Sequence, residues 1–197
     1  MAAISRRILL QLATAGSTAA FLTPHATATA GASRPNLITS VETSPGAIDA
    51  YIAKTHFAGI ATLPDIQAEY RSVIPIFPLV LPAKWSFPAD PGLSAPDSDT
   101  LWERGNGVAA AYMIWQKAVA TEAYERQKRG DSDQRDRHLD ILEMAYSTEV
   151  RKAVIIDDGN VFIDGGKQSG SAAGTQSPLK AARGGDFAPM RAFLRMD

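Results

Sequence analysis

Apolar residues recur every three or four positions along the chain from Leu101 to Val119. This spacing places them on one face of an α-helix. Thr100 and Glu103 fit a capping box at its start, and the pattern predicts that the helix reaches Arg129. The last turns carry two expected ion pairs on a solvated face: Glu122 with Arg126, and Glu125 with Arg129.

A second amphipathic helix is expected directly after the first. Gly130 can end the first helix, and Asp131 can cap the next one together with Gln134. The apolar face of this second helix has four main positions: Leu139, Leu142, Tyr146 and Val150. Two long helices joined by a tight Gly-Asp turn predict an antiparallel helical hairpin.

Three shorter helices are expected to flank the hairpin. Ser44-Pro45 is a start signal for a helix over 44–58, and Leu63-Pro64-Asp65 can begin a turn or two over 63–73. Asp186 can cap a closing helix over 186–194. Apolar spacing supports the last two, through Ile66, Tyr70 and Val73 in one, and Phe187, Met190 and Leu194 in the other.

Six prolines lie between Ile74 and Pro96, with large apolar residues between them. Proline fixes φ and favours extended geometry in the residue before it. We therefore expect an extended arm that lies across the helices and buries its apolar side chains. The alternative is a proline-rich ligand for an aromatic groove, but such ligands are usually polar around their prolines.

The periodicity changes after the hairpin, over 154–163, where two β-branched runs flank Asp158-Gly159. This is a signal for a small β-hairpin, and a helix ending near Ile156 is the rival interpretation. A Gly/Ser-rich loop follows over 165–177. The expected fold is therefore mostly α: a helical hairpin core, short flanking helices, an extended proline-rich arm and a small β-hairpin.

The N-terminal 30 residues resemble a twin-arginine export signal. Ser5 precedes the pair Arg6-Arg7, and residues 8–22 are apolar or small and carry no charge. Pro24 then breaks the helix, and a small-residue cleavage site follows at Ala28, Ala30 and Gly31. An amphipathic first helix is disfavoured because no polar face repeats. A membrane anchor is disfavoured because a span needs about 20 strongly apolar residues.

The signal divides the chain into residues 1–30, a flexible leader over 31–43, and a single helical domain over 44–197. The weak hydrophobicity of residues 8–22 favours the twin-arginine route over the general secretory route. The expected location is secreted, periplasmic or in the cell envelope, with no stable membrane span in the mature form. The expected partners are the twin-arginine export machinery, a signal peptidase and an extracytoplasmic partner.

Composition adds two constraints. The chain of 197 residues has net charge −1, and removal of residues 1–30 leaves 18 basic against 21 acidic residues. No long block of like charge occurs, so a nucleic-acid partner is not expected. Cysteine is absent, which excludes disulfides, thiolate nucleophiles and Cys-ligated metals. A chain of this length can hold itself together by packing alone.

The motifs of common cofactor sites are not completed. No Walker loop surrounds Gly166-Lys167, and the Asp157-Asp158 segment lacks the closing glutamate of a calcium loop. Gly105 and Gly107 resemble a dinucleotide fingerprint but lie within the helical pattern, so we expect them to permit close packing, for example of the proline arm. No cofactor is therefore expected. His138, at the charged start of a helix, is expected to be solvated.

Parts of the mature chain resemble a group of uncharacterised small exported or membrane-anchored proteins of actinobacteria. Four features carry the resemblance: Trp102-Glu103 leading to Gly107, then Trp115, the Gly130-Asp131 turn, and the segment AARGGDFAPMR at 181–191. They cover about half of the chain. The resemblance implies export and a helical fold, and it implies no activity.

Two functional hypotheses follow. The first is a non-enzymatic extracytoplasmic protein that binds a partner in a groove between the hairpin and the arm, or serves as an envelope accessory protein. The residues expected to line the groove are Trp85, Phe87, Tyr112, Trp115 and His56, although the aromatic ones are equally expected in the core. The alternative is a small cofactor-free hydrolase assembled from distant residues such as His56, Asp157 and Asp158.

Overall fold

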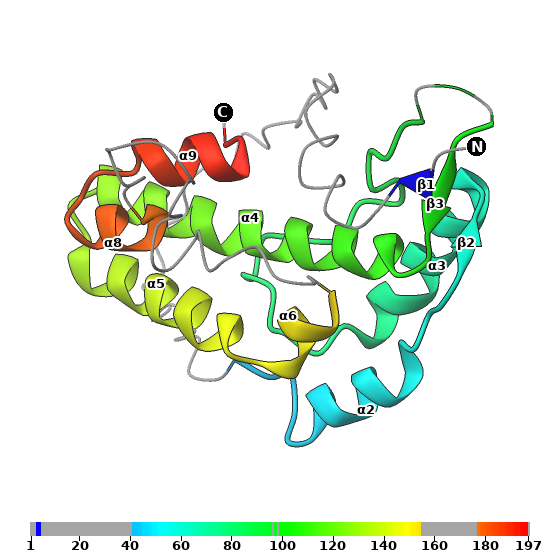
Figure 1. The fold of residues 1–197 in the computed structure, drawn as a ribbon. Helices are drawn as coiled ribbons and strands as arrows, with labels where there is room; N and C mark the ends of the chain where they lie inside the picture. Colours follow the sequence, from blue (N-terminus) through cyan, green and yellow to red (C-terminus); the bar gives the residue numbers. More distant parts are fainter. Residues whose placement is uncertain (1–2, 5–40, 96, 98, 155–176, 197) are drawn as a thin grey trace.

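The longest element is a helix, α4, which spans Asn106–Lys128 and passes through the middle of the molecule (Figure 1). The computed structural model describes residues 3–4, 41–95, 97, 99–154 and 177–196. The other helices in these ranges are α2 (Ala47–Lys54), α3 (Leu63–Val73), a 3-10 turn (Ile74–Ile76), α5 (Ser132–Tyr146), α6 (Glu149–Val154), α8 (Pro178–Arg183) and α9 (Ala188–Leu194). The mostly α fold expected from the sequence is confirmed.

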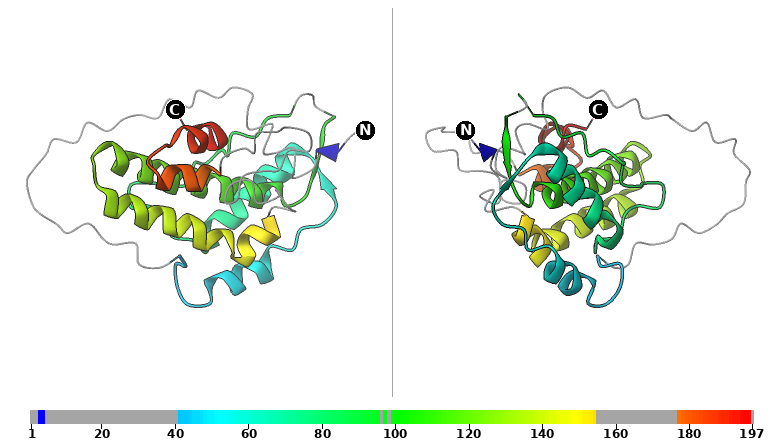
Figure 2. Two further views of the ribbon diagram at one scale, coloured as in Figure 1. Left: turned by 60° about the vertical axis from the view of Figure 1, so that its left-hand side comes forward. Right: turned by 90° about the vertical axis from the view of Figure 1, so that its right-hand side faces the viewer.

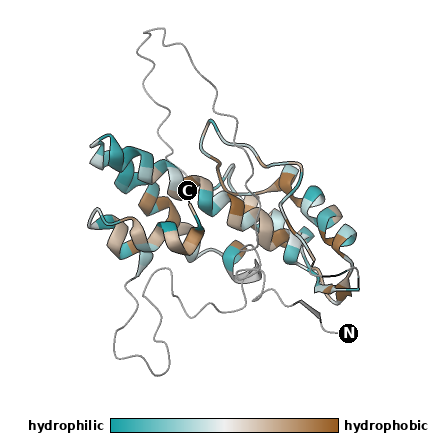
Figure 3. Ribbon diagram, turned by 90° about the horizontal axis from the view of Figure 1, so that it is seen from above, coloured by the Kyte–Doolittle hydropathy of each residue, from teal (hydrophilic) through white to brown (hydrophobic). Residues whose placement is uncertain are grey.

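Helices α4 and α5 form the predicted antiparallel hairpin (Figure 1). Gly130 adopts φ 73°, and the backbone N–H of Gln134 donates to Asp131 Oδ1 at 3.2 Å, so the predicted cap of α5 is present. The turn end of the hairpin is hydrophilic in Figure 3. The second helix is interrupted, however: α5 ends at Tyr146, and Thr148 Oγ1 donates to the carbonyl of Ala145 before α6 begins.

The predicted start of α4 is wrong. Leu101–Glu103 is a strand, β3, and Thr100 Oγ1 donates to Asp97 Oδ1 at 2.8 Å instead of capping a helix. β3 pairs with β2 (Ile60–Ala61) in antiparallel fashion and with β1 (Ala3–Ile4) in parallel fashion. The helix begins after Gly105, whose φ of 93° turns the chain. The apolar spacing that predicted helix from Leu101 onward therefore includes a strand residue, Trp102, which is fully buried.

Helix α3 crosses the first turn of α4 at close range. An added Cβ on Gly107 would lie 2.6 Å from both the carbonyl oxygen of Ile66 and the backbone nitrogen of Tyr70. The expected packing role of this glycine is confirmed, and the neighbour is α3 rather than the proline arm. A capping box at Thr62 and Asp65 starts α3, which runs for 11 residues and buries Ile66, Tyr70 and Val73.

The proline-rich arm lies across the helices as predicted. Phe77 and Leu79 are buried, and two side chains of the helices donate to arm carbonyls at 2.8 Å: Trp115 Nε1 to Val80, and Tyr70 Oη to Pro88. The arm also pairs with residues 41–43. The N–H of Thr43 donates to Pro78, and that of Val80 donates to Val41. Residues 41–43, the end of the predicted leader, therefore form backbone hydrogen bonds with the arm.

The remaining helices cover the hairpin. Figure 2 shows α8 and α9 against α4 and α5, and α2 beside α6, which agrees with the contacts between these elements. Ser177 caps α8. The N-cap residue of α9 is Phe187, one residue after the predicted cap Asp186, and Asp186 Oδ1 accepts the N–H of Ala188 at 2.9 Å. Met190 and Leu194 are buried as expected. Helix α2 begins at Ala47 and ends at Lys54, short of the predicted Ala58.

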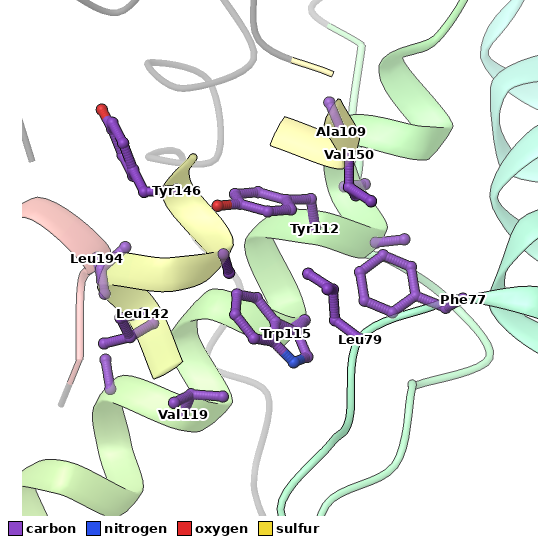
Figure 4. Close-up of a cluster of buried hydrophobic side chains, with 14 of the residues drawn as sticks. Phe77, Leu79, Ala109, Tyr112, Trp115, Val119, Leu142, Tyr146, Val150 and Leu194 are labelled. Atoms are coloured by element: carbon purple, nitrogen blue, oxygen red, sulfur yellow. The ribbon is translucent and has the colours of Figure 1, made fainter. Parts of the chain in front are cut away.

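The core lies where α4 meets α5, α6 and the arm. Figure 4 shows its rings and branched side chains, with Tyr112 and Trp115 between Leu79 of the arm and Leu142 of α5. None of the helices in the described ranges is long and apolar enough to cross a membrane. The predicted β-hairpin over 154–163 and the Gly/Ser loop fall mainly on residues outside those that the structure describes.

Candidate functional site

The aromatic residues expected to line a groove are divided between core and arm. Tyr112 and Trp115 are 1% and 0% exposed, and their ring centroids lie 5.6 Å apart in the core. Phe87 is half-buried and packs edge-on against Phe77 at 5.1 Å. His56 is exposed in the segment after α2. Tyr112 and Trp115 are therefore core residues, which was the other expectation for these two side chains, and they do not line a groove.

Trp85 is the one predicted groove residue that belongs to a charged cluster. Its indole Nε1 donates to Glu122 Oε1 at 3.2 Å, and Lys84 Nζ lies 2.6 Å from the same oxygen. Glu122 is on α4, whereas Lys84 and Trp85 are on the arm. His138 of α5, whose charge acts on Glu122, completes this group. We call these four residues the arm–hairpin junction, and they are the candidate site.

Glu122 is buried and ionised at this junction. Its side chain is 8% exposed, in contrast to the predicted solvated pair with Arg126. Burial acts to raise the pKa of the carboxyl, but hydrogen bonds from Lys84 and Trp85 and the charges of Lys84 and His138 outweigh it and lower the pKa. The other predicted pair is also wrong: Glu125 contacts Lys128 at 2.6 Å, and Arg126 contacts Asp131.

His138 is buried as well, so its predicted solvation is wrong. It is 6% exposed, and its Nδ1 lies 2.6 Å from the carbonyl oxygen of Gln134. Because a carbonyl only accepts, Nδ1 carries a proton and donates it to this oxygen. The face of α5 that carries His138 also carries Leu142 and Ala145, and this face packs against α4. Its helical register, rather than its charged neighbours, decides its burial.

A second buried carboxylate, Glu69 of α3, caps the N-terminus of α4. Its Oε1 accepts the N–H groups of Gly107 at 2.9 Å and Val108 at 3.2 Å, and its Oε2 accepts that of Gly105 at 3.0 Å. A negative charge at this end also complements the helix dipole. Sequence reasoning missed this residue. The signal was present, because Glu69 interrupts the apolar face formed by Ile66, Tyr70 and Val73.

Tyr51 of α2 lies near this cap. Its side chain is 1% exposed, and its hydroxyl has no hydrogen-bond partner in the part of the chain that the structure describes. Burial and the charge of Glu69 raise the pKa of the phenol above its usual range. The indole Nε1 of Trp102 is likewise buried and unpartnered among these residues. We interpret Glu69 as a structural cap of α4 that is enclosed by core side chains.

The comparisons with known proteins add no relative. No family model, curated protein or solved structure matches the chain. Within the described ranges, no group of three or more His, Asp or Glu side chains is placed to hold a metal ion. Several predicted site residues fall outside the described residues: Arg6, Arg7, Ala28, Ala30, Gly31, Asp157 and Asp158. The candidate site therefore rests on the geometry of the arm–hairpin junction.

Proposed function

We propose that this protein is exported through the twin-arginine route and works outside the cytoplasm as a non-enzymatic binding or envelope accessory domain. The sequence Ser5-Arg6-Arg7 followed by an uncharged apolar segment carries the proposal. It has a cationic start that stays inside, an apolar stretch and a small-residue cleavage site. The proposed location is secreted, periplasmic or at the cell envelope.

The short pairing of strand β1 supports a removable N-terminus. The buried hydrophobic residues of the described chain run from Tyr51 to Met196. Of residues 1–30 the structure describes Ala3 and Ile4, which form strand β1 and pair with Leu101 and Trp102. Pairing over two residues contributes little stability on its own, and β3 keeps its antiparallel partner β2. A domain without cysteine can also fold by packing alone before export.

Fractionation tests the export route. Replacement of both Arg6 and Arg7 by Lys keeps the positive charge and removes the arginine pair, so we expect the protein to remain in the cytoplasm. The matched control is Arg137→Lys, at an exposed position of α5, which should be exported normally. Export of the double variant at the control level would refute the twin-arginine route. N-terminal sequencing of the exported protein should begin at Gly31, and an intact Met1 would refute cleavage.

The binding role is supported by the composition of the arm–hairpin junction. Lys84 is largely exposed and Trp85 half-exposed, so the arm presents a charged and an aromatic group beside a buried carboxylate. Such a combination is suited to recognition of a polar partner. The chain is also mildly acidic after loss of Arg6 and Arg7, which favours a basic partner.

A second candidate, a small hydrolase, is supported by a different observation. The imidazole of His138 lies within electrostatic reach of the ionised Glu122, and its Nε2 has no hydrogen-bond partner among the described residues. An imidazole that interacts electrostatically with a carboxylate can activate water as a general base. Hydrolysis of fluorogenic ester and peptide substrates tests this candidate. A rate that His138→Asn reduces at least tenfold would favour it, whereas an equal rate in both proteins would exclude His138.

A further inference from the structure

The two oxygens of the Glu122 carboxylate are used unequally. Lys84 Nζ at 2.6 Å and Trp85 Nε1 at 3.2 Å both contact Oε1. Oε2 accepts no hydrogen bond from the residues that the structure describes. A carboxylate has about four lone-pair sites, and the described residues occupy two of them, both on Oε1.

The ammonium group that balances Glu122 can be exchanged. Lys84 belongs to the arm rather than to α4, and its side chain is 59% exposed, whereas that of Glu122 is 8% exposed. A long side chain in solvent gains little from holding one geometry, because ordering it costs rotamer entropy. Lys84 therefore reaches Oε1 from an exposed position on the arm, and an external cation would approach the carboxylate from the same side.

We infer that Glu122 is the acceptor of a cation-binding site that Lys84 occupies in cis, and that the basic side chain of a partner protein replaces Lys84 there. Arginine suits this site best. Its planar guanidinium presents two parallel N–H groups that can reach Oε1 and Oε2 together, which a lysine ammonium cannot do. The half-exposed ring of Trp85 beside the carboxylate adds an aromatic surface on which a guanidinium can stack.

The inference deepens the proposed binding role. It rests on the proposed function only in placing the partner outside the cytoplasm. The site itself is independent of export. Binding of a small guanidinium compound in solution depends only on Glu122 and Lys84, whereas export depends on Arg6 and Arg7. The two proposals can therefore fail separately.

The test is a titration of the full chain with methylguanidinium chloride at constant ionic strength. Binding is followed by the indole N–H resonance of Trp85, which Trp85→Phe assigns among the three tryptophans. In Lys84→Met the competing ammonium is absent and the apolar stem is kept, so we expect the dissociation constant to fall about fivefold below that of the wild type, the usual strength of an exposed ion pair. Glu122→Gln should abolish the saturable shift.

The matched control is Lys128→Met, because Lys128 is also a half-exposed lysine paired with a carboxylate of α4, Glu125. It should bind as the wild type does. Lys84→Arg provides a second variant that keeps an ion pair and the fold, and it should bind no more tightly than the wild type. Equal affinities of Lys84→Met and the wild type, a similar gain in Lys128→Met, or saturable binding that survives in Glu122→Gln would each overturn the inference.

Discussion

The carboxylate of Glu69 accepts the backbone N–H of Gly107 at 2.9 Å, across 38 residues of sequence. This contact joins α3 to the first turn of α4 and takes the place of the local capping box that the sequence suggested at Thr100 and Glu103. The absence of a Cβ on Gly107 permits the approach of α3, and the charge of Glu69 satisfies the N–H groups that the approach buries. The two residues therefore act together to set the crossing of the two helices.

Replacement of Glu69 should be among the most destabilising changes at a polar position. Glu69→Gln keeps the shape but puts an amide, with one oxygen instead of two, opposite three N–H donors, and a buried unsatisfied group costs about 1–3 kcal/mol. We expect the free energy of unfolding in urea to fall by about 2–3 kcal/mol. The control Glu125→Gln, at a partly exposed pair, should change it by less than about 0.5 kcal/mol. Equal losses would contradict the capping role.

Gly107 and Gly130 separate steric from conformational effects of glycine. Gly107→Ala would put its Cβ 2.6 Å from two backbone atoms of α3, which must move apart. Gly130→Ala meets no atom within 4 Å but is strained by φ 73°. We expect thermal denaturation to show a loss of about 3 kcal/mol or more for the first variant and about 1 kcal/mol for the second. Reversal of this order would mean that α3 and α4 are not in close contact.

The hairpin and the two buried carboxylates show how far the sequence could predict the fold. The hairpin turn at Gly130 and Asp131 was predictable because its cap and its positive φ are local. Burial of Leu139 and Leu142 was predictable from helical period. The carboxylates of Glu69 and Glu122 were assigned to solvent or overlooked, because each is buried by an element distant in sequence. Periodicity identifies which face a residue is on, but it does not identify what covers that face.

The same limit applies to the candidate site. Trp85 was predicted in a groove, and it does lie at the junction of arm and hairpin, but its partner Glu122 had been assigned to a solvated ion pair with Arg126. Trp85, which supplies the indole N–H, lies 37 positions before Glu122 in the sequence, and Lys84 lies 38 positions before it. Long-range hydrogen bonds of this kind have no local pattern, so the charged part of the site could be found only from the structure.

Trp85→Phe should loosen the arm without emptying its packing site. The substitution removes the N–H that donates to Glu122 Oε1 but keeps an aromatic ring. A hydrogen bond to a charged group contributes about 1.5–3 kcal/mol, and Lys84 remains to balance the carboxylate, so we expect a loss near 1.5 kcal/mol. Hydrogen exchange at the N–H of Val80, which joins the arm to the carbonyl of Val41, should be faster in this variant than in the wild type. Unchanged exchange there would show that the hydrogen bond from Trp85 to Glu122 does not restrain the arm.

Glu122 should contribute to the loss of stability in acid. Burial acts against its ionised form, but Lys84, Trp85 and the charge of His138 lower its pKa in the folded protein below its value in the unfolded chain. Between the two pKa values the unfolded chain binds more protons, so stability rises with pH there. The contribution is present above the unfolded value of about 4.3 and is lost as the pH falls through the folded value. Urea unfolding at several pH values measures this loss.

Glu122→Gln isolates the contribution, because other carboxyls also titrate in the same range. The pKa values of Asp65 and Asp136 are lowered by hydrogen bonds from Thr62 and Arg135, and both should lose their contributions in acid too. The wild type should therefore lose more stability than Glu122→Gln between pH 6 and pH 3, and the two curves should converge at the acid end. Parallel curves over this range would show that the carboxylate of Glu122 has the same pKa in the folded and unfolded protein.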